Sequence, residues 1–137
     1  MAMKKYKLGD LISVCDERNS YGYTNFYGLN INKEFMPTWA NTEGLDESKY
    51  KVVRKKRFVF SGMQTGRDGC IRISMYNGKE PIIVSPAYTT FEVTREDLVL
   101  SEYFFMLFLS REKDRLGAFC SDGSIRSNLD WERFVDF

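Results

Sequence analysis

A series of short apolar runs between residues 51 and 93 constrains the fold of this chain more than any other feature. The clearest run reads CIRISMY over residues 70–76 and alternates between apolar and polar side chains. A period of two places Ile71, Ile73 and Met75 on one face of a β-strand and the residues between them on the other. The alternation therefore predicts a half-buried strand.

Further strands and a turn are predicted on either side of this segment. Runs rich in β-branched and aromatic residues are typical of strands. We predict strands at residues 27–32, 51–53, 57–60, 81–85 and 87–93. Asn77 and Gly78, which follow the alternating strand, favour a tight turn of the hairpin type.

The period of the pattern changes after these strands. Ser101 is a favourable N-cap, and residues 102–116 contain no helix breaker before Gly117. Because this segment is apolar nearly all round in its first two turns, we predict a buried helix. Shorter helices are predicted at residues 8–15 and 129–134.

The order of these elements predicts an α+β (mixed α/β) fold. The chain has 137 residues, of which 43% are hydrophobic, so its length fits one domain with one core. We expect a curved, mostly antiparallel sheet packed against the buried helix.

Charge and cysteine content exclude several classes of protein. The net charge is +1, so any basic surface must be local. Three cysteines without a C-x-x-C pair argue against a disulfide framework and a zinc site, and the lack of histidine excludes imidazole-based triads. The chain has neither a secretory signal nor an apolar run of the ~20 residues that a membrane span needs. We therefore expect a cytoplasmic protein without a cofactor.

Two basic, polar segments lie near the strand at 57–60. The first is a run of four cations, Arg54, Lys55, Lys56 and Arg57, which fits either phosphate contacts or a solvated β-turn. The second, FSGMQTGRDGCIRIS at residues 60–74, matches no nucleotide-binding glycine motif. It is either a plain hairpin or a loop whose polar side chains contact phosphates and base edges. Those side chains are Gln64, Thr65 and Arg67.

A third polar segment lies near the C-terminal end of the sequence. Ser124, Arg126 and Asn128 alternate, so an extended chain would place them on one face, where they could contact DNA. Alternatively, Ser127 and Asn128 cap the last helix and Arg126 pairs with a carboxylate.

Seven segments distributed along nearly the whole chain form one ordered pattern. They are YKLGDL, NINKEFMP, LDESKYKVV, FSGMQTGRDGCIRIS, VSPAYTTFEV, LSEYFFMLFLS and GSIRSNLDWERF. Taken in this order, they resemble the target recognition domain of the DNA specificity subunit of type I restriction-modification systems. The order and spacing of KY-VV, VSPAY and G-IR-NL-W--F are the most specific part of this resemblance.

This resemblance implies a non-catalytic α/β globule, similar to the recognition domains of some adenine methyltransferases, that reads one half of a split DNA target. The implied partners are double-stranded DNA, the methyltransferase and restriction subunits, and a second specificity domain or half-subunit. The family continues into a linker and a long helix after WERFVDF. We therefore expect residues 1–137 to form a single recognition domain without that spacer helix.

Within the resemblance, the polar segments become candidate DNA contacts. The loop at 19–30 is expected to read bases, because tyrosine and asparagine can hydrogen-bond base edges. Its candidate side chains are Asn19, Tyr21, Tyr23 and Asn25. Lys33 is expected to contact a phosphate, and Arg72 is a further candidate contact. The alternative is a truncated specificity domain that binds the methyltransferase subunit without useful DNA binding.

Arg67→Ala tests how the glycine-rich loop would contact DNA. If Arg67 holds a base through two hydrogen bonds, the variant loses about 1–3 kcal/mol of binding free energy for the target sequence only. If Arg67 holds a phosphate, affinity falls alike for every sequence. Titration of target and scrambled duplexes distinguishes the two, and unchanged affinity for both would remove Arg67 from the contact set.

Overall fold

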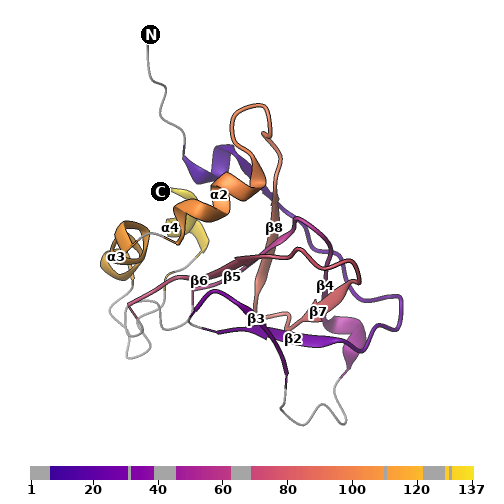
Figure 1. Ribbon diagram of the computed structural model, residues 1–137. Helices are drawn as coiled ribbons and strands as arrows, with labels where there is room; N and C mark the ends of the chain where they lie inside the picture. The colour runs from indigo at the N-terminus through magenta and orange to yellow at the C-terminus, as the bar shows by residue number, and fades with distance from the viewer. Residues whose placement is uncertain are drawn as a thin grey trace.

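The computed structural model describes residues 7–30, 32–38, 46–62, 69–109, 111–121, 129 and 131–137. These residues form an α+β domain with eight strands in two sheets, which do not close into a barrel (Figure 1). Sheet A contains, in spatial order, β1 (Ile12–Val14), β8 (Thr89–Val93), β5 (Phe58–Ser61) and β6 (Arg72–Met75). Sheet B contains β3 (Phe35–Pro37), β2 (Phe26–Leu29), β7 (Ile82–Val84) and β4 (Lys51–Val53).

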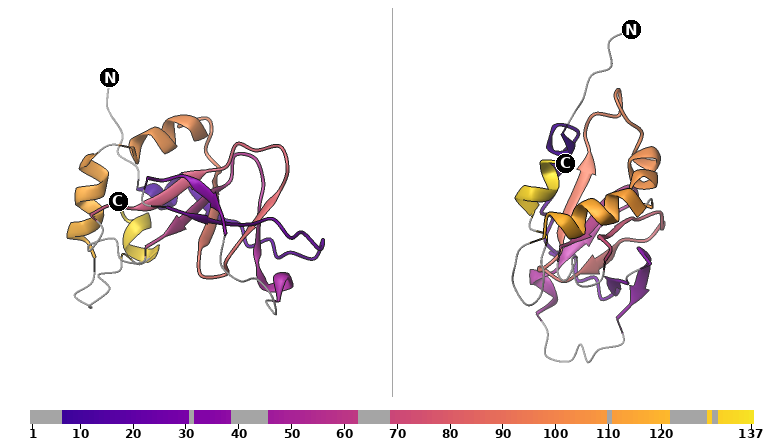
Figure 2. Two further views of the ribbon diagram at one scale, coloured as in Figure 1. Left: turned by 60° about the horizontal axis from the view of Figure 1, so that its bottom comes forward. Right: turned by 90° about the vertical axis from the view of Figure 1, so that its left-hand side faces the viewer.

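All neighbouring strands pair antiparallel except β2 and β7, which are parallel. The helical elements are short. They are the 3-10 turns η1 (Leu8–Asp10) and η2 (Glu47–Lys49) and the helices α2 (Ser101–Leu107), α3 (Arg111–Phe119) and α4 (Trp131–Val135). Figures 1 and 2 show the three α-helices gathered on one side of the domain and sheet B on the other.

Sheet A is the middle layer, because both of its faces are buried. Alternation along β5 directs Phe58 and Phe60 into the core under the helices, and Val59 into a second core shared with sheet B. In the first core, Phe60 stacks on Phe134 of α4 with ring centroids 4.3 Å apart, and Phe58 stacks on Phe91 at 5.1 Å. The two cores therefore meet along one fully buried strand.

The structure confirms the α+β class and the antiparallel character, but it divides the expected sheet into two. The predicted strands are present: β4 has the predicted ends, and the ends of the others are shifted by at most three residues. The strand at 70–76 was predicted to be half-buried, but Ser74, which lies on its polar face, is only 4% exposed. Sheet B covers that face, so the strand is buried on both sides.

Two of the predicted helices, at residues 8–15 and 102–116, are wrong in extent. Residues 8–15 form only the short turn η1 followed by β1, in which Ile12 pairs with Val93. The segment 102–116 is divided between α2 and α3, and Gly117 lies inside α3 instead of ending it. Ser101 is not the N-cap: Leu100 occupies that position, and the Ser101 hydroxyl donates to Glu96 Oε1 at 2.8 Å.

Three further corrections concern a turn, a strand and the start of a helix. Asn77 and Gly78 do not close a hairpin, because β6 and β7 belong to different sheets and the chain crosses between the sheets here. Strand β3, which pairs with β2 through Leu29 and Phe35, was not predicted. The last helix begins two residues later than predicted, at Trp131.

Gly62→Ala is expected to destabilise the fold. A Cβ at residue 62 would lie 1.5 Å from the carbonyl oxygen of Leu129, so the two backbone segments would have to separate. We expect a loss of about 3 kcal/mol or more in the free energy of unfolding, measured by urea denaturation, because overpacking against backbone cannot relax. Gly69→Ala is the matched control: its φ of +69° with open space around it predicts about 1–2 kcal/mol of backbone strain alone. Equal losses for the two variants would contradict this account.

Candidate nucleic-acid interface

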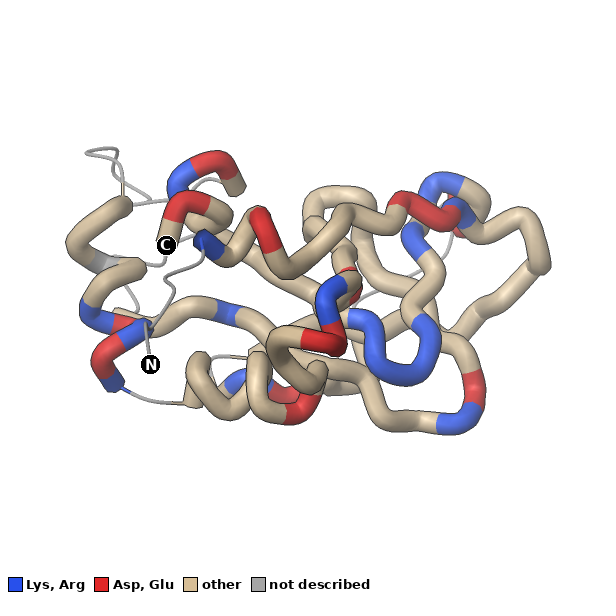
Figure 3. Tube along the Cα trace, turned by 90° about the horizontal axis from the view of Figure 1, so that it is seen from above, with Lys and Arg blue, Asp and Glu red and all other residues tan. Residues whose placement is uncertain are grey.

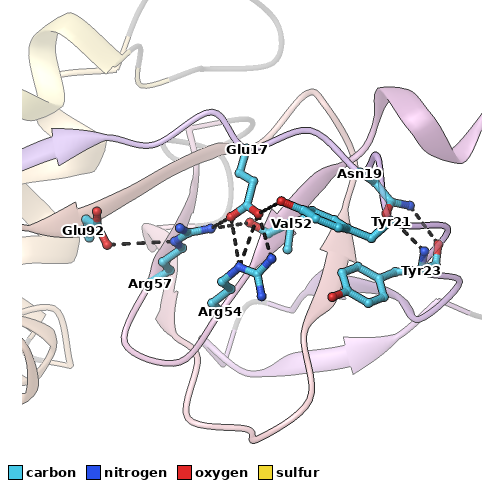
Figure 4. Close-up of polar contacts among 8 residues, drawn as sticks. All are labelled: Glu17, Asn19, Tyr21, Tyr23, Val52, Arg54, Arg57 and Glu92. Carbon is cyan, nitrogen blue, oxygen red and sulfur yellow. Dashed lines mark hydrogen bonds and ion pairs between the residues drawn. The ribbon is translucent and has the colours of Figure 1, made fainter.

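The carboxylate of Glu17 lies at the centre of the predicted basic turn. Arg54 donates to it through Nε (3.0 Å) and Nη2 (2.8 Å), Arg57 donates through Nη1, and the hydroxyl of Tyr21 donates at 2.7 Å (Figure 4). We call these four residues the Glu17 cluster. Two of the four cations that were candidates for phosphate contacts are thus paired with Glu17, an acidic residue that was not among the candidates.

The Glu17 cluster joins the two sheets. The segment around Glu17 leaves β1 and then follows the edge of β4, where Val52 N donates to Glu17 O at 2.7 Å. The turn with Arg54 and Arg57 connects β4 of sheet B to β5 of sheet A. The ion pairs of Glu17 with Arg54 and Arg57 therefore connect two places at which the chain passes between the sheets.

The charged groups of the Glu17 cluster shift each other's pKa values. Hydrogen bonds from Arg54, Arg57 and Tyr21 lower the pKa of Glu17 far below its ordinary value, although partial burial opposes the shift. The same pairing raises the pKa of Arg54. Glu17 is therefore ionised at neutral pH, and it accepts hydrogen bonds without donating any.

The predicted base-reading loop has an internal framework. Asn19 is 2% exposed: its Oδ1 accepts from Tyr23 N at 3.1 Å, and its Nδ2 donates to Tyr23 O at 2.8 Å and to Glu47 O at 3.2 Å. Asn19 is thus a structural residue, and its prediction as a base contact is wrong. Tyr21 and Asn25 remain exposed, and Asn25 Nδ2 donates to Pro81 O at 3.3 Å.

The other two cations of the turn point into solvent. Lys55 and Lys56 are exposed, and Lys56 has φ of +70° at the apex of the turn. Lys56 Nζ lies 3.6 Å from Glu102 of α2, with about half of each side chain exposed. In Figure 3 the four cations form the blue arc along the tube. Only the two lysines of this arc are available for a ligand without breaking the Glu17 cluster.

Lys33 is buried, which contradicts its prediction as a phosphate contact. The residue is 8% exposed, and its Nζ donates to Ile71 O at 2.6 Å and to Asp114 Oδ1 at 2.7 Å. Asp114 also accepts from Ile71 N at 2.9 Å. We call these three residues the Lys33 anchor, because they tie the β2–β3 turn and the start of β6 to α3. Removing the lysine would leave a carboxylate and a carbonyl without this donor.

The remaining candidate DNA contacts are Arg72 and six residues of the segments that follow β5 and α3 in the sequence. Arg72 is half-buried in β6. Six candidates lie outside the described residues: Gln64, Thr65, Arg67, Ser124, Arg126 and Asn128. The residues next to these two segments are in contact, since Leu129 N donates to Gly62 O at 2.7 Å.

The basic turn and the contact between Gly62 and Leu129 lie at opposite ends of β5. Turn 54–57 precedes this strand and the contact follows it. Five residue-to-residue steps of extended chain lead from Arg57 to Gly62, a distance of roughly 17 Å. A single ligand would have to span that distance to contact both groups.

The Glu17 cluster and the Lys33 anchor carried no signal in the sequence. Glu17 is 37 residues from Arg54, and Lys33 is 81 residues from Asp114. Neither pair matches a motif or a helical spacing. Among the described residues, there is no group of three or more His, Cys, Asp or Glu side chains arranged to hold a metal ion.

No protein-family model matches the chain, and a search of curated proteins finds none with significant sequence similarity. In the part of the chain that the structure describes, none of the helices has the length and apolar character to cross a lipid bilayer.

Glu17→Gln should destabilise the domain at neutral pH and change its pH dependence. The folded-state pKa of Glu17 lies below its ordinary value of about 4.3, so its stabilisation is complete above that pH and is lost as the pH falls. At pH 7 we expect a loss of about 1–2 kcal/mol, at the lower end for charged hydrogen bonds because the side chain is 22% exposed.

Urea unfolding at several pH values between 7 and 3 would measure this effect. The difference between wild type and Glu17→Gln should shrink as the pH falls below about 4.3. Asp97→Asn, which breaks the solvent-exposed ion pair with Arg95, is the control and should change stability little. A constant difference at all pH values would argue against an ionised Glu17 as the source of the stabilisation.

Proposed function

We propose that this domain binds double-stranded DNA in a sequence-specific manner and supplies target specificity to a type I restriction-modification complex. In this proposal it is a non-catalytic, cytoplasmic component that needs no cofactor and assembles with the methyltransferase and restriction subunits. The observation that carries the proposal is the hydrogen bond from Leu129 N to Gly62 O. It joins the residue before one segment to the residue after the other, and the two segments hold six of the candidate DNA contacts.

The rigid surroundings of these segments support the same proposal. On one side, Leu129 is 1% exposed and lies in the core with Phe60 and Phe134. On the other, the Lys33 anchor fixes Ile71 to α3. Loops that read DNA bases need fixed points of attachment, because a displacement of about 1 Å at the attachment misaligns hydrogen bonds to a base.

The exposed lysines suggest how a duplex would lie. Lys55 and Lys56 are at one end of β5 and the contact between Gly62 and Leu129 is at the other, roughly 17 Å away by strand geometry. The major groove of B-DNA is about 12 Å wide, so a duplex that lies across the strand direction would meet both groups. The lysines would then contact phosphates on one side of the groove while the loops read its floor.

The second candidate function is a protein-interaction module that binds the methyltransferase subunit. It is favoured by the outer face of α2 and the residues next to it, where four large apolar side chains are more than half exposed at three-residue spacing. They are Leu100, Tyr103, Met106 and Leu109. Contiguous exposed apolar residues of this kind mark protein contacts more often than DNA contacts.

Salt dependence would distinguish the two functions. Fluorescence titration of a labelled random duplex at low and high salt should give a steep decrease in affinity if the domain binds DNA, because each phosphate contact releases counterions. A flat or absent response would favour the protein-interaction module.

Lys55→Ala and Lys56→Ala are expected to weaken binding to all duplexes alike. Each variant should lower the slope of log affinity against log salt by about 1, since each removes one phosphate contact. Lys7→Ala is the control, because Lys7 is exposed but pairs with Asp136 at 2.8 Å near η1. An unchanged slope in the double variant Lys55→Ala/Lys56→Ala would remove the basic turn from the DNA-binding surface.

A further inference from the structure

The side chain of Tyr21 is largely exposed, yet contacts with Glu17, Arg54 and Tyr23 hold its ring in place. The residue is 53% exposed, yet its hydroxyl donates to Glu17 at 2.7 Å and the guanidinium of Arg54 lies 5.3 Å from its ring centroid. The ring of Tyr23 is also 5.3 Å away, tilted by 33°. In Figure 4 the ring of Tyr21 is seen close to edge-on, with Arg54 and Tyr23 both below it.

The backbone that carries Tyr21 is fixed as well. Asn19 holds both the N–H and the carbonyl of Tyr23, which closes a turn with Tyr21 near its middle and Gly22 at φ +77°. An exposed aromatic ring normally samples several rotamers, and ordering it has an entropic cost. Here the ring is held in place before any ligand arrives, so a ligand that stacks on it would not have to order it.

The hydrogen bond of Tyr21 changes what this residue can offer to a nucleic acid. Because Glu17 is ionised, the tyrosine proton is committed to the carboxylate and cannot be donated to a base edge. What remains accessible is the aromatic surface of the ring. Aromatic surfaces bind nucleobases by stacking, which needs a base that is not already stacked on both sides within a duplex.

We propose that Tyr21, supported by Arg54 and Tyr23, is a stacking site for an unpaired nucleobase of DNA. The inference rests on the proposed function in taking DNA as the ligand, and it adds that the bound DNA presents one base outside the helical stack. Arg54 adds positive charge beside the ring, and Lys55 follows it directly in the chain with an exposed side chain. A base on the ring would therefore have its own phosphate near a cation.

A purely structural role for the ring makes a different prediction. In that role Tyr21 only shields the ion pair between Glu17 and Arg54 from water, so its loss would lower stability without affecting any preference among DNA ligands. Comparing Tyr21→Phe with Tyr21→Leu separates these roles. Both variants lose the hydrogen bond to Glu17, but only phenylalanine keeps an aromatic surface.

The experiment uses two labelled probes, a fully paired duplex and the same duplex with one additional unpaired nucleotide at its centre. Affinities are measured by fluorescence anisotropy with the full chain at fixed salt. We expect the wild type to prefer the probe with the unpaired nucleotide by about 5- to 150-fold, the range of a single base–aromatic stack. Tyr21→Phe should keep the preference and Tyr21→Leu should lose it. Tyr103→Leu, which removes a tyrosine of similar exposure (56%) from α2, should keep it.

Each outcome bears on a different claim. Equal affinity for the two probes, or a preference that survives in Tyr21→Leu, overturns the stacking site and leaves the proposed function standing if the paired duplex is bound. Binding of the unpaired probe alone overturns the proposed duplex-binding function but supports the stacking site. Failure to bind either probe overturns both proposals.

Discussion

The hydrogen bonds that the Glu17 carboxylate accepts from Arg54 and Arg57 hold together the places where the chain passes between the two sheets. The chain passes from sheet A to the edge of sheet B just after β1, and it returns from β4 to β5 through a turn of four consecutive cations. Two of these cations, Arg54 and Arg57, would repel each other without the anion that lies between them. Because one carboxylate accepts hydrogen bonds from both and offsets part of their repulsion, the basic turn can be tight, and the loop with Tyr21 is attached to the same point.

The features of the fold that could be predicted are those encoded by neighbouring residues. The alternation in residues 70–76 identified β6, and β-branched runs identified the other central strands, because a two-residue period is a local property. The division into two sheets could not be predicted. The parallel pairing of β2 with β7 depends on residues more than 50 positions apart. The segment at 8–15 was misread because Leu8, Leu11 and Ile12 are buried equally well by a turn followed by a strand.

The partners of the candidate residues could not be predicted from the sequence for the same reason. Residue type indicates that a lysine or an asparagine can contact DNA, but it does not reveal which of them already has a partner. Lys33 and Asn19 are occupied by groups brought close only by the fold, and both are buried. Lys55 and Lys56 belong to the same run as Arg54 and Arg57, yet the structure assigns the lysines to solvent and the arginines to Glu17. Pairing with a residue distant in the sequence therefore distinguishes the two arginines from the two lysines, which composition alone does not.

The contact between Gly62 and Leu129 has a consequence for how such a domain can change over evolutionary time. The hydrogen bond and the Lys33 anchor are formed by residues outside the segments 63–68 and 122–128, so these bonds do not depend on the side chains within either segment. Phe60, Ile71 and Leu129, which flank these segments in the sequence, belong to the hydrophobic core. A substitution inside either segment would therefore leave the residues that form this backbone contact, and the core residues that flank it, chemically unchanged.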